Sequence, residues 1–175
     1  LIGSSLSRAL YKHNISKNIY GLDISDDVIA NCKRLKLVIE VKKNINEFKE
    51  QFDLIIIASP LSTYKNIFSY LNNFITKPTL LTDVGSTKVS VIDDFNEKVK
   101  NNNILFLPSH PIAGIEKSGP EYGMANLFEN RYCIITPIKK EESFIKHISK
   151  MWNDIGMKIE IMDAEHHDRV LAMTS

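Results

Sequence analysis

Residues 53–60 read DLIIIASP, five apolar residues between an aspartate and a Ser-Pro pair. A run this short, wholly apolar and rich in β-branched side chains is typical of a strand buried on both faces. Ser59 and Pro60 end it, because proline has no N–H to give to a sheet ladder. The stretch therefore predicts a central strand of a parallel sheet.

Strand and helix alternate outward from this stretch in both directions. Residues 63–74 have apolar side chains at helical spacing, and residues 79–84 form another apolar strand, closed by Gly85. Further strands are expected at 18–23, around 38–40, and at 104–107, 132–136 and 158–162. Helices are expected at 4–11, 26–34, 88–99, 141–154 and from 164 onward. A helical turn is expected at 44–50 and a long polar loop at 108–126. This alternation predicts the α/β class, with a doubly wound, mostly parallel sheet and helices on both faces.

Composition excludes several classes of protein. The 175 residues suffice for one domain, and 22 Lys and Arg against 21 Asp and Glu give a net charge of +1, so neither a generally basic nucleic-acid surface nor a nucleic-acid partner is expected. No apolar run approaches the roughly 20 residues of a membrane helix, and no signal peptide is visible. Cys32 and Cys133 lack metal-like spacing and are expected to be free thiols in the cytoplasm, with no metal site.

The N-terminal residues resemble part of a dinucleotide-binding fingerprint. Gly3 and Ser4 open the first helix, where Gly3 would be the third glycine of the phosphate turn, and Asp23 follows about twenty residues later. A carboxylate there would accept both ribose hydroxyls and repel a 2′-phosphate, so NAD is expected rather than NADP. The predicted cofactor contacts here are Gly3, Ser4, Asp23 and Ile24. On these positions alone, Gly3 is equally any small residue at a helix start, and Asp23 any acid after a strand.

Two further strand ends support a nucleotide site of the Rossmann type. Ser59 with Pro60, and Asp83 with Val84, follow neighbouring predicted strands. Ligands of open α/β sheets bind at the carboxyl ends of the strands. These four residues are therefore predicted to contact the cofactor.

Residues 109–120, SHPIAGIEKSGP, are the most informative stretch of the chain. They follow a strand and combine a histidine, an acid and small residues in a loop longer than a simple connection needs. His110 could accept the proton of an alcohol whose carbon loses hydride, because an imidazole titrates near neutrality. A single loop histidine is otherwise an ordinary surface residue. Lys88 is expected to be a surface lysine on the first turn of its helix.

Four stretches resemble the prephenate dehydrogenase family, which includes the arogenate and cyclohexadienyl dehydrogenases. They are DVGSTK (83–88), HPIAGIEKSG (110–119), LFENRYCIITP (127–137) and HDRVLAMTS (167–175), in order along the chain. The resemblance implies an NAD(P)-dependent oxidation coupled to decarboxylation. Hydride leaves the ring carbon that bears the hydroxyl, the ring carboxylate departs as CO2, and the ring becomes aromatic.

The same resemblance implies roles for individual residues. His110 would be the catalytic histidine that binds the substrate hydroxyl, and Ser86 would assist it. Glu116 would stand at the pocket mouth, with Ile115 and Ser175 also on the substrate side. From the residues themselves, Ser86 could instead cap the helix that begins at Thr87, and Glu116 could be a solvated acid. His167 and Asp168 match a family motif, with a role in packing or pocket lining left open.

The resemblance also implies a division of the chain. Residues 1–162 would be the NAD(P)-binding domain without its first strand, and residues 163–175 would begin the helix into a C-terminal helical domain, absent here, that makes the full-length protein a homodimer. The substrate is expected to be prephenate, with arogenate or both as the alternative. Another dehydrogenase of small 2-hydroxy acids, or a nucleotide-binding module without catalysis, remain the competing interpretations.

Overall fold

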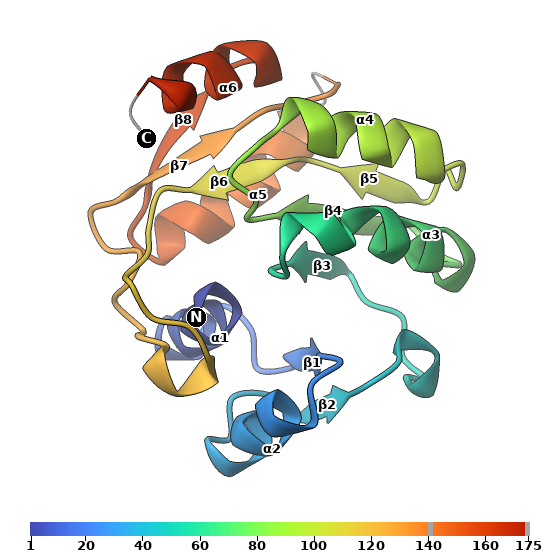
Figure 1. Cartoon of the computed structure of the whole chain (residues 1–175), viewed down its shortest axis with the longest axis vertical. Coiled ribbons are helices and arrows are strands. Elements are labelled where there is room, and N and C mark those ends of the chain that lie inside the picture. The colour runs from blue at the N-terminus through green and yellow to red at the C-terminus, as the bar shows by residue number, and fades with distance from the viewer. Residues whose placement is uncertain (140–141, 174–175) are drawn as a thin grey trace.

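The computed structural model describes residues 1–139 and 142–173 and confirms the α/β class (Figure 1). The helices are α1 (Ile2–Lys12), α2 (Asp26–Arg34), α3 (Tyr64–Phe74), α4 (Val89–Lys98), α5 (Glu142–Asp154) and α6 (Ala164–Ala172). The strands are β1 (Tyr20–Leu22), β2 (Glu40–Lys42), β3 (Leu54–Ile57), β4 (Thr79–Asp83), β5 (Ile104–Phe106), β6 (Ser109–Pro111), β7 (Tyr132–Ile135) and β8 (Lys158–Ile161). Short 3-10 helices span Ile45–Glu47 (η1), Leu61–Thr63 (η2) and Pro120–Tyr122 (η3).

The strands form three hydrogen-bonded groups, and nearly all of their pairings are parallel. β1 pairs with β2, β4 lies between β3 and β5, and β7 lies between β6 and β8. Ile57 is in register with Asp83, so β3 and β4 end together. The turns that follow them, at Ser59 and at Val84, therefore lie at one edge of the sheet.

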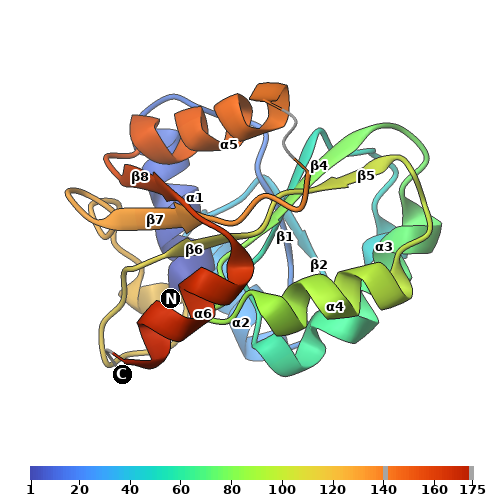
Figure 2. The same ribbon diagram turned by 90° about the horizontal axis from the view of Figure 1, so that it is seen from above.

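Successive side chains of the central strands enter two different cores. Leu54 and Ile56 of β3 pack against a core built from α1, α5 and the residues around β7. Ile57 belongs to a second core, with α3 and α4. Figure 2 shows α5 on one side of the strands and α3, α4 and α6 on the other. This period-2 alternation is why a strand buried on both faces is apolar throughout.

Two sequence predictions differ from the structure. The weak strand expected around 38–40 is β2, at Glu40–Lys42. The expected polar loop at 108–126 contains strand β6, which pairs antiparallel with β7, so that His110 lies opposite Ile134. A strand of three residues is too short to show a periodic pattern. Its hydrogen-bonding partner also lies more than twenty residues away along the chain, so no local signal indicates the pairing. Among the described residues, no helix is long and apolar enough to cross a membrane.

Candidate functional site

Helix α1 begins at the sheet edge and presents its N-terminus without a side-chain cap from any described residue. Its first turn contains no acid, so its free backbone N–H groups and positive dipole end are suited to an anion. Gly3 packs against the end of β3, where an added Cβ would meet the Ala58 Cβ at 3.4 Å. That is an ordinary contact, so the position requires a small residue but not strictly glycine. Ser4 donates from Oγ to the Leu1 carbonyl oxygen at 2.9 Å.

Asp23 follows β1 directly, in a half-buried turn. Its Oδ1 accepts a hydrogen bond from the Ser25 backbone N–H at 2.9 Å, which holds the carboxylate in place. The neighbouring Ile24 side chain is 80% exposed. An oriented acid beside an exposed apolar side chain fits the ribose and adenine ends of a dinucleotide.

The turn after β3 is built by local hydrogen bonds. Ser59 Oγ and Thr63 Oγ1 lie 2.8 Å apart, and the Pro60 carbonyl accepts from the Thr63 hydroxyl at 2.7 Å. Val84 follows β4 and donates its N–H to the Ile57 carbonyl at 3.1 Å. Ser59, Pro60 and Val84 thus share the sheet edge at which α1 begins.

Asp83 is predicted from the sequence to contact the cofactor, but in the structure its side chain is completely buried. Its Oδ2 accepts from the Lys88 Nζ at 2.6 Å and from the Gly85 N–H at 2.8 Å, while Oδ1 accepts from the Ser109 N–H at 3.1 Å. With these partners it cannot also reach a ligand. The carboxylate instead joins the end of β4 to the start of β6.

Lys88, expected at the surface, is also wholly buried. Its ammonium group contacts Asp83 and donates to the Ser109 carbonyl at 2.8 Å. Burial lowers the pKa of Lys88 and raises that of Asp83, and their contact opposes both shifts. A charge this deep requires a partner, and the carboxylate supplies it. Together the two residues fix Ser109, the residue before His110.

His110 lies in β6 and is partly buried. Burial, helped by His167 and then Lys88, lowers the pKa of His110 to about 4, whereas Asp168 opposes the shift. The imidazole is therefore neutral at physiological pH and retains one nitrogen lone pair. This is the protonation state that a proton acceptor requires.

His167 and Asp168 of α6 complete the surroundings of His110. The Nε2 of His167 lies 2.9 Å from the Nδ1 of His110, and its own Nδ1 lies 2.7 Å from Asp168 Oδ1. His167 is wholly buried. Asp168 also accepts the Lys88 and Val89 backbone N–H groups at 2.8 and 3.0 Å, and so caps α4.

The remaining predicted substrate residues lie on exposed loops. Ser86 is exposed just before α4 and does not cap it, since Asp168 does so from another helix. Ile115 and Glu116 are exposed in the loop after β6, and Ser175 lies outside the described residues. This loop returns to α1, where an added Cβ on Gly123 would lie 2.9 Å from the Ser4 Cβ. The loop after β6 and helix α1 are therefore in contact.

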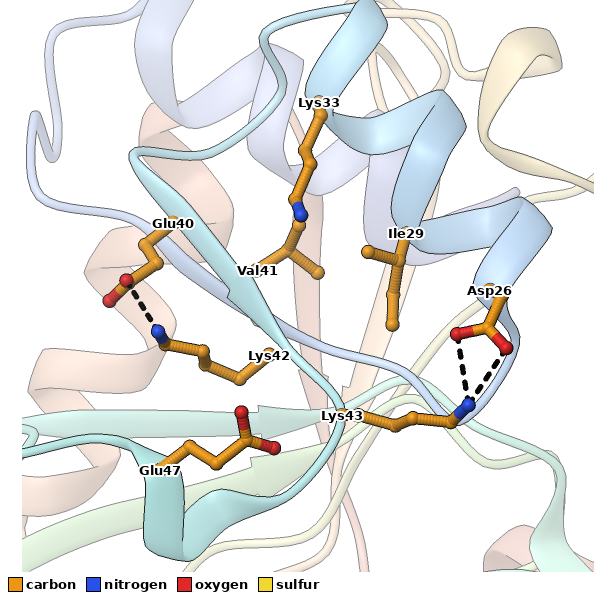
Figure 3. Close-up of a pocket in the computed structure, with 8 residues that line it drawn as sticks. All are labelled: Asp26, Ile29, Lys33, Glu40, Val41, Lys42, Lys43 and Glu47. Carbon is orange, nitrogen blue, oxygen red and sulfur yellow. Dashed lines mark hydrogen bonds and ion pairs between the residues drawn. The ribbon is translucent and has the colours of Figure 1, made fainter.

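A separate hollow of about 300 Å³ lies between α2 and β2 (Figure 3). It is charged, but Lys43 contacts Asp26 at 2.8 Å and Lys42 contacts Glu40 at 2.7 Å across its walls. None of the predicted catalytic, substrate or cofactor residues lines this hollow. In the described part of the chain, no group of three or more His, Cys, Asp or Glu side chains could hold a metal ion.

The arrangement suits a dinucleotide along the sheet edge and an alcohol substrate at His110. The N-terminus of α1, with no acid in its first turn, and the oriented Asp23 fit the pyrophosphate and the ribose. Sequence reasoning missed the burial of Lys88 and left the part played by His167 open. An acid at the end of an apolar strand, as Asp83 is, signals that a buried cation must lie nearby, but the sequence does not say which one.

Comparison with known families and proteins agrees with this geometry. Residues 6–161 match the family described as prephenate dehydrogenase, nucleotide-binding domain. The whole chain is 35% identical to the cyclohexadienyl dehydrogenase of Zymomonas mobilis, covering 59% of it, and 31% identical to the prephenate dehydrogenase of Lactococcus lactis, covering 48%. The chain thus spans about half the length of the curated relatives it matches.

Solved structures of prephenate dehydrogenases also resemble this chain closely. The prephenate dehydrogenase of Aquifex aeolicus superposes with a TM-score of 0.91 at 31% identity, over 99% of this chain and 62% of that one. A complex of the A. aeolicus enzyme with hydroxyphenyl propionate and NAD+ superposes with a TM-score of 0.87 at 32% identity, over 97% of this chain and 59% of that one.

Proposed function

Since this chain belongs to the prephenate dehydrogenase family, whose nucleotide-binding domain it carries, we propose that it is the cofactor-binding part of an enzyme that oxidises prephenate with NAD. The product is 4-hydroxyphenylpyruvate, and CO2 is released. The observation that supports this proposal most strongly is the state of His110: a neutral imidazole beside the sheet edge whose Nδ1 lies within hydrogen-bond distance of His167.

His110 supplies the base in this reaction. Its Nε2 accepts the proton of the ring hydroxyl while the carbon bearing that hydroxyl loses hydride. Bound NAD serves as the hydride acceptor. Loss of the ring carboxylate as CO2 then leaves an aromatic phenolate, which takes the proton back from His110 to give the phenol of the product. The protein therefore mainly has to orient the reactants and polarise one hydroxyl. Ser86, exposed on the loop between β4 and α4, assists at the hydroxyl.

NAD rather than NADP is the proposed cofactor. Asp23, held by the Ser25 N–H, accepts the ribose hydroxyls and repels a 2′-phosphate. Gly3 and Ser4 at the N-terminus of α1 receive the pyrophosphate, and Ile24, Ser59 and Pro60 border the cofactor. The A. aeolicus complex with NAD+ supports this choice.

The substrate side extends beyond His110. Glu116 and Ile115 on the loop after β6, and Ser175, are proposed to face the substrate. A C-terminal helical domain following residues 163–175 would complete the pocket and form a homodimer in the cytoplasm. Residues 1–162 would then be the NAD-binding domain.

The test of the proposed base is His110→Asn in the full-length protein. We expect turnover of prephenate to fall by roughly 100- to 10,000-fold, the range that a positioned general base contributes, while NAD affinity stays nearly unchanged. Initial rates and calorimetric NAD titration measure the two effects. Turnover equal to that of the wild type would remove His110 from the mechanism.

Substrate choice is tested by a matrix of prephenate and arogenate against NAD and NADP. We expect the highest kcat/KM for prephenate with NAD. Comparable rates with arogenate would instead indicate dual specificity, as the name of the Z. mobilis relative suggests. NAD binding without turnover of either compound would indicate a binding module.

A further inference from the structure

The three side chains Asp168, His167 and His110 form one continuous line of hydrogen bonds. The distances are 2.7 Å from Asp168 Oδ1 to His167 Nδ1, and 2.9 Å from His167 Nε2 to His110 Nδ1. The rings of His167 and His110 meet edge to face, with centroids 5.1 Å apart. The members come from α6 and β6, 57 residues apart, so this alignment is a product of the tertiary structure.

Asp168, at the end of this line, determines which atom donates and which accepts in each of its hydrogen bonds. An ionised carboxylate can only accept, so His167 donates its Nδ1–H to Asp168. A neutral His167 then has its lone pair on Nε2, which accepts the Nδ1–H of His110. The lone pair of His110 is consequently on Nε2, the nitrogen that can turn toward a substrate.

Several features hold Asp168 ionised and fixed. It accepts the Lys88 and Val89 N–H groups at the N-terminus of α4, where the helix dipole favours a negative charge. These bonds and the contact with His167 outweigh partial burial and lower the pKa of Asp168. The orientation of His110 therefore depends on a helix end in a different part of the chain.

We propose that His167 is a positioning and relay residue: it fixes the tautomer of His110 and takes over the proton that His110 removes from the substrate. This proposal rests on the proposed function. As Nε2 of His110 binds the substrate proton, the Nδ1–H of His110 passes to Nε2 of His167. His110 is again neutral, and the charge rests on a His167 imidazolium paired with Asp168. No oxidant or reductant is involved in this step. After CO2 leaves, the proton returns along the same line to the phenolate oxygen of the product, and both histidines regain their starting tautomers.

The relay resolves a difficulty in using His110 as a base. The surroundings that keep it neutral also make its own cation unfavourable. Burial is the largest cause, a protonated His167 and the Lys88 ammonium act in the same direction, and Asp168 opposes them. Passing the proton one residue further places the positive charge directly beside the Asp168 carboxylate. Opposite charges in such a poorly solvated place attract strongly.

The first measurement needs no variant. In the 15N-histidine-labelled full-length enzyme, NMR should show neutral His110 and His167 both protonated on Nδ1. His110 protonated on Nε2 would overturn the proposal.

The second measurement uses His167→Gln, whose amide oxygen can still accept from His110 but cannot take a proton. We expect kcat to fall roughly 10- to 100-fold, with KM for substrate and for NAD within about twofold of the wild type. His166→Gln is the matched control, because His166 is exposed on the same helix, and it should leave kcat unchanged. An unchanged kcat in His167→Gln would overturn the relay.

The two proposals fail differently. If His110→Asn lowers turnover while His167→Gln does not, only the relay is wrong. If His110→Asn is itself without effect, the proposed base is wrong, and the NMR result then reports a structural hydrogen bond only.

Discussion

At the scale of single residues, Asp23 should determine which nicotinamide cofactor is used. Its carboxylate is oriented by the Ser25 N–H at 2.9 Å, in the turn after β1. Asp23→Ala removes both the acceptor for the ribose hydroxyls and the repulsion of a 2′-phosphate. We expect the ratio of kcat/KM for NAD to that for NADP to fall at least tenfold, an effect of about 1.4 kcal/mol. An unchanged ratio would mean that the ribose is recognised elsewhere.

His110 should also make stability depend on pH. Its pKa is lowered from 6.5 to about 4 in the folded protein. Between these values the unfolded chain binds a proton on His110 and the folded chain does not, so the free energy of unfolding falls as the pH drops through this window. His110→Asn should therefore reduce the loss of thermal stability between pH 7 and pH 4.5. An equally steep loss in the variant would contradict the neutral, buried imidazole.

At the scale of secondary-structure elements, the Lys88–Asp83 ion pair joins β4, α4 and β6. Lys88→Met leaves a buried carboxylate without its cation, which typically costs about 3–5 kcal/mol. We expect urea unfolding to show a loss of this size, together with reduced turnover, because Ser109 and the adjacent His110 lose their support.

Lys98→Met is a suitable comparison for that variant. Lys98 lies on the same helix and forms an ion pair with Glu97 at 2.7 Å, but at the surface. Exposed pairs contribute little, so this variant should unfold nearly like the wild type. Equal behaviour of the two lysine variants would show that the buried pair does not support the site.

At the scale of the whole molecule, aromatic packing is one of the contacts that join the β1–β2 pair to the rest, since Phe52 also stacks on Phe74 of α3. β1 is not hydrogen-bonded to β3 in the described residues, and Figure 1 shows the β1–β2 pair and α2 at the opposite end of the molecule from α6. Phe48 is buried, with its ring centroid 5.8 Å from that of Tyr20 and 5.3 Å from that of Phe52. The position of Asp23 therefore depends on this cluster.

Phe48→Ala should destabilise the protein by about 3 kcal/mol and raise KM for NAD more than it lowers kcat. Phe106→Ala is the control: Phe106 is buried in the second core, the one with α3 and α4, against Phe68 and Phe95. It should cost similar stability without a selective effect on NAD. Thermal unfolding and steady-state kinetics on both variants test this. A similar rise in KM for both would show that general destabilisation, not the position of Asp23, is responsible.

Local signals in the sequence suffice for the fold class and for the edge of the sheet at which the site is expected. Short apolar strands such as 53–58 that alternate with amphipathic helices permit few arrangements other than a doubly wound sheet. In such a sheet the carboxyl ends of the strands converge, which brings Asp23, Ser59 and Val84 to one edge. These signals are local in the chain, since each depends on periodicity or on a turn residue.

The surroundings of His110 depend on how distant parts of the chain pack. Lys88 appeared to be a surface lysine and Asp83 a cofactor ligand, yet the two neutralise each other in the interior. The pairing of His110 with Ile134 and the contact of His110 with His167 join residues that are 24 and 57 positions apart in the chain. Burial and contacts between such distant segments leave no periodic trace in a sequence. They arise only when the helices and strands pack, and they determine the charge and orientation of the imidazole.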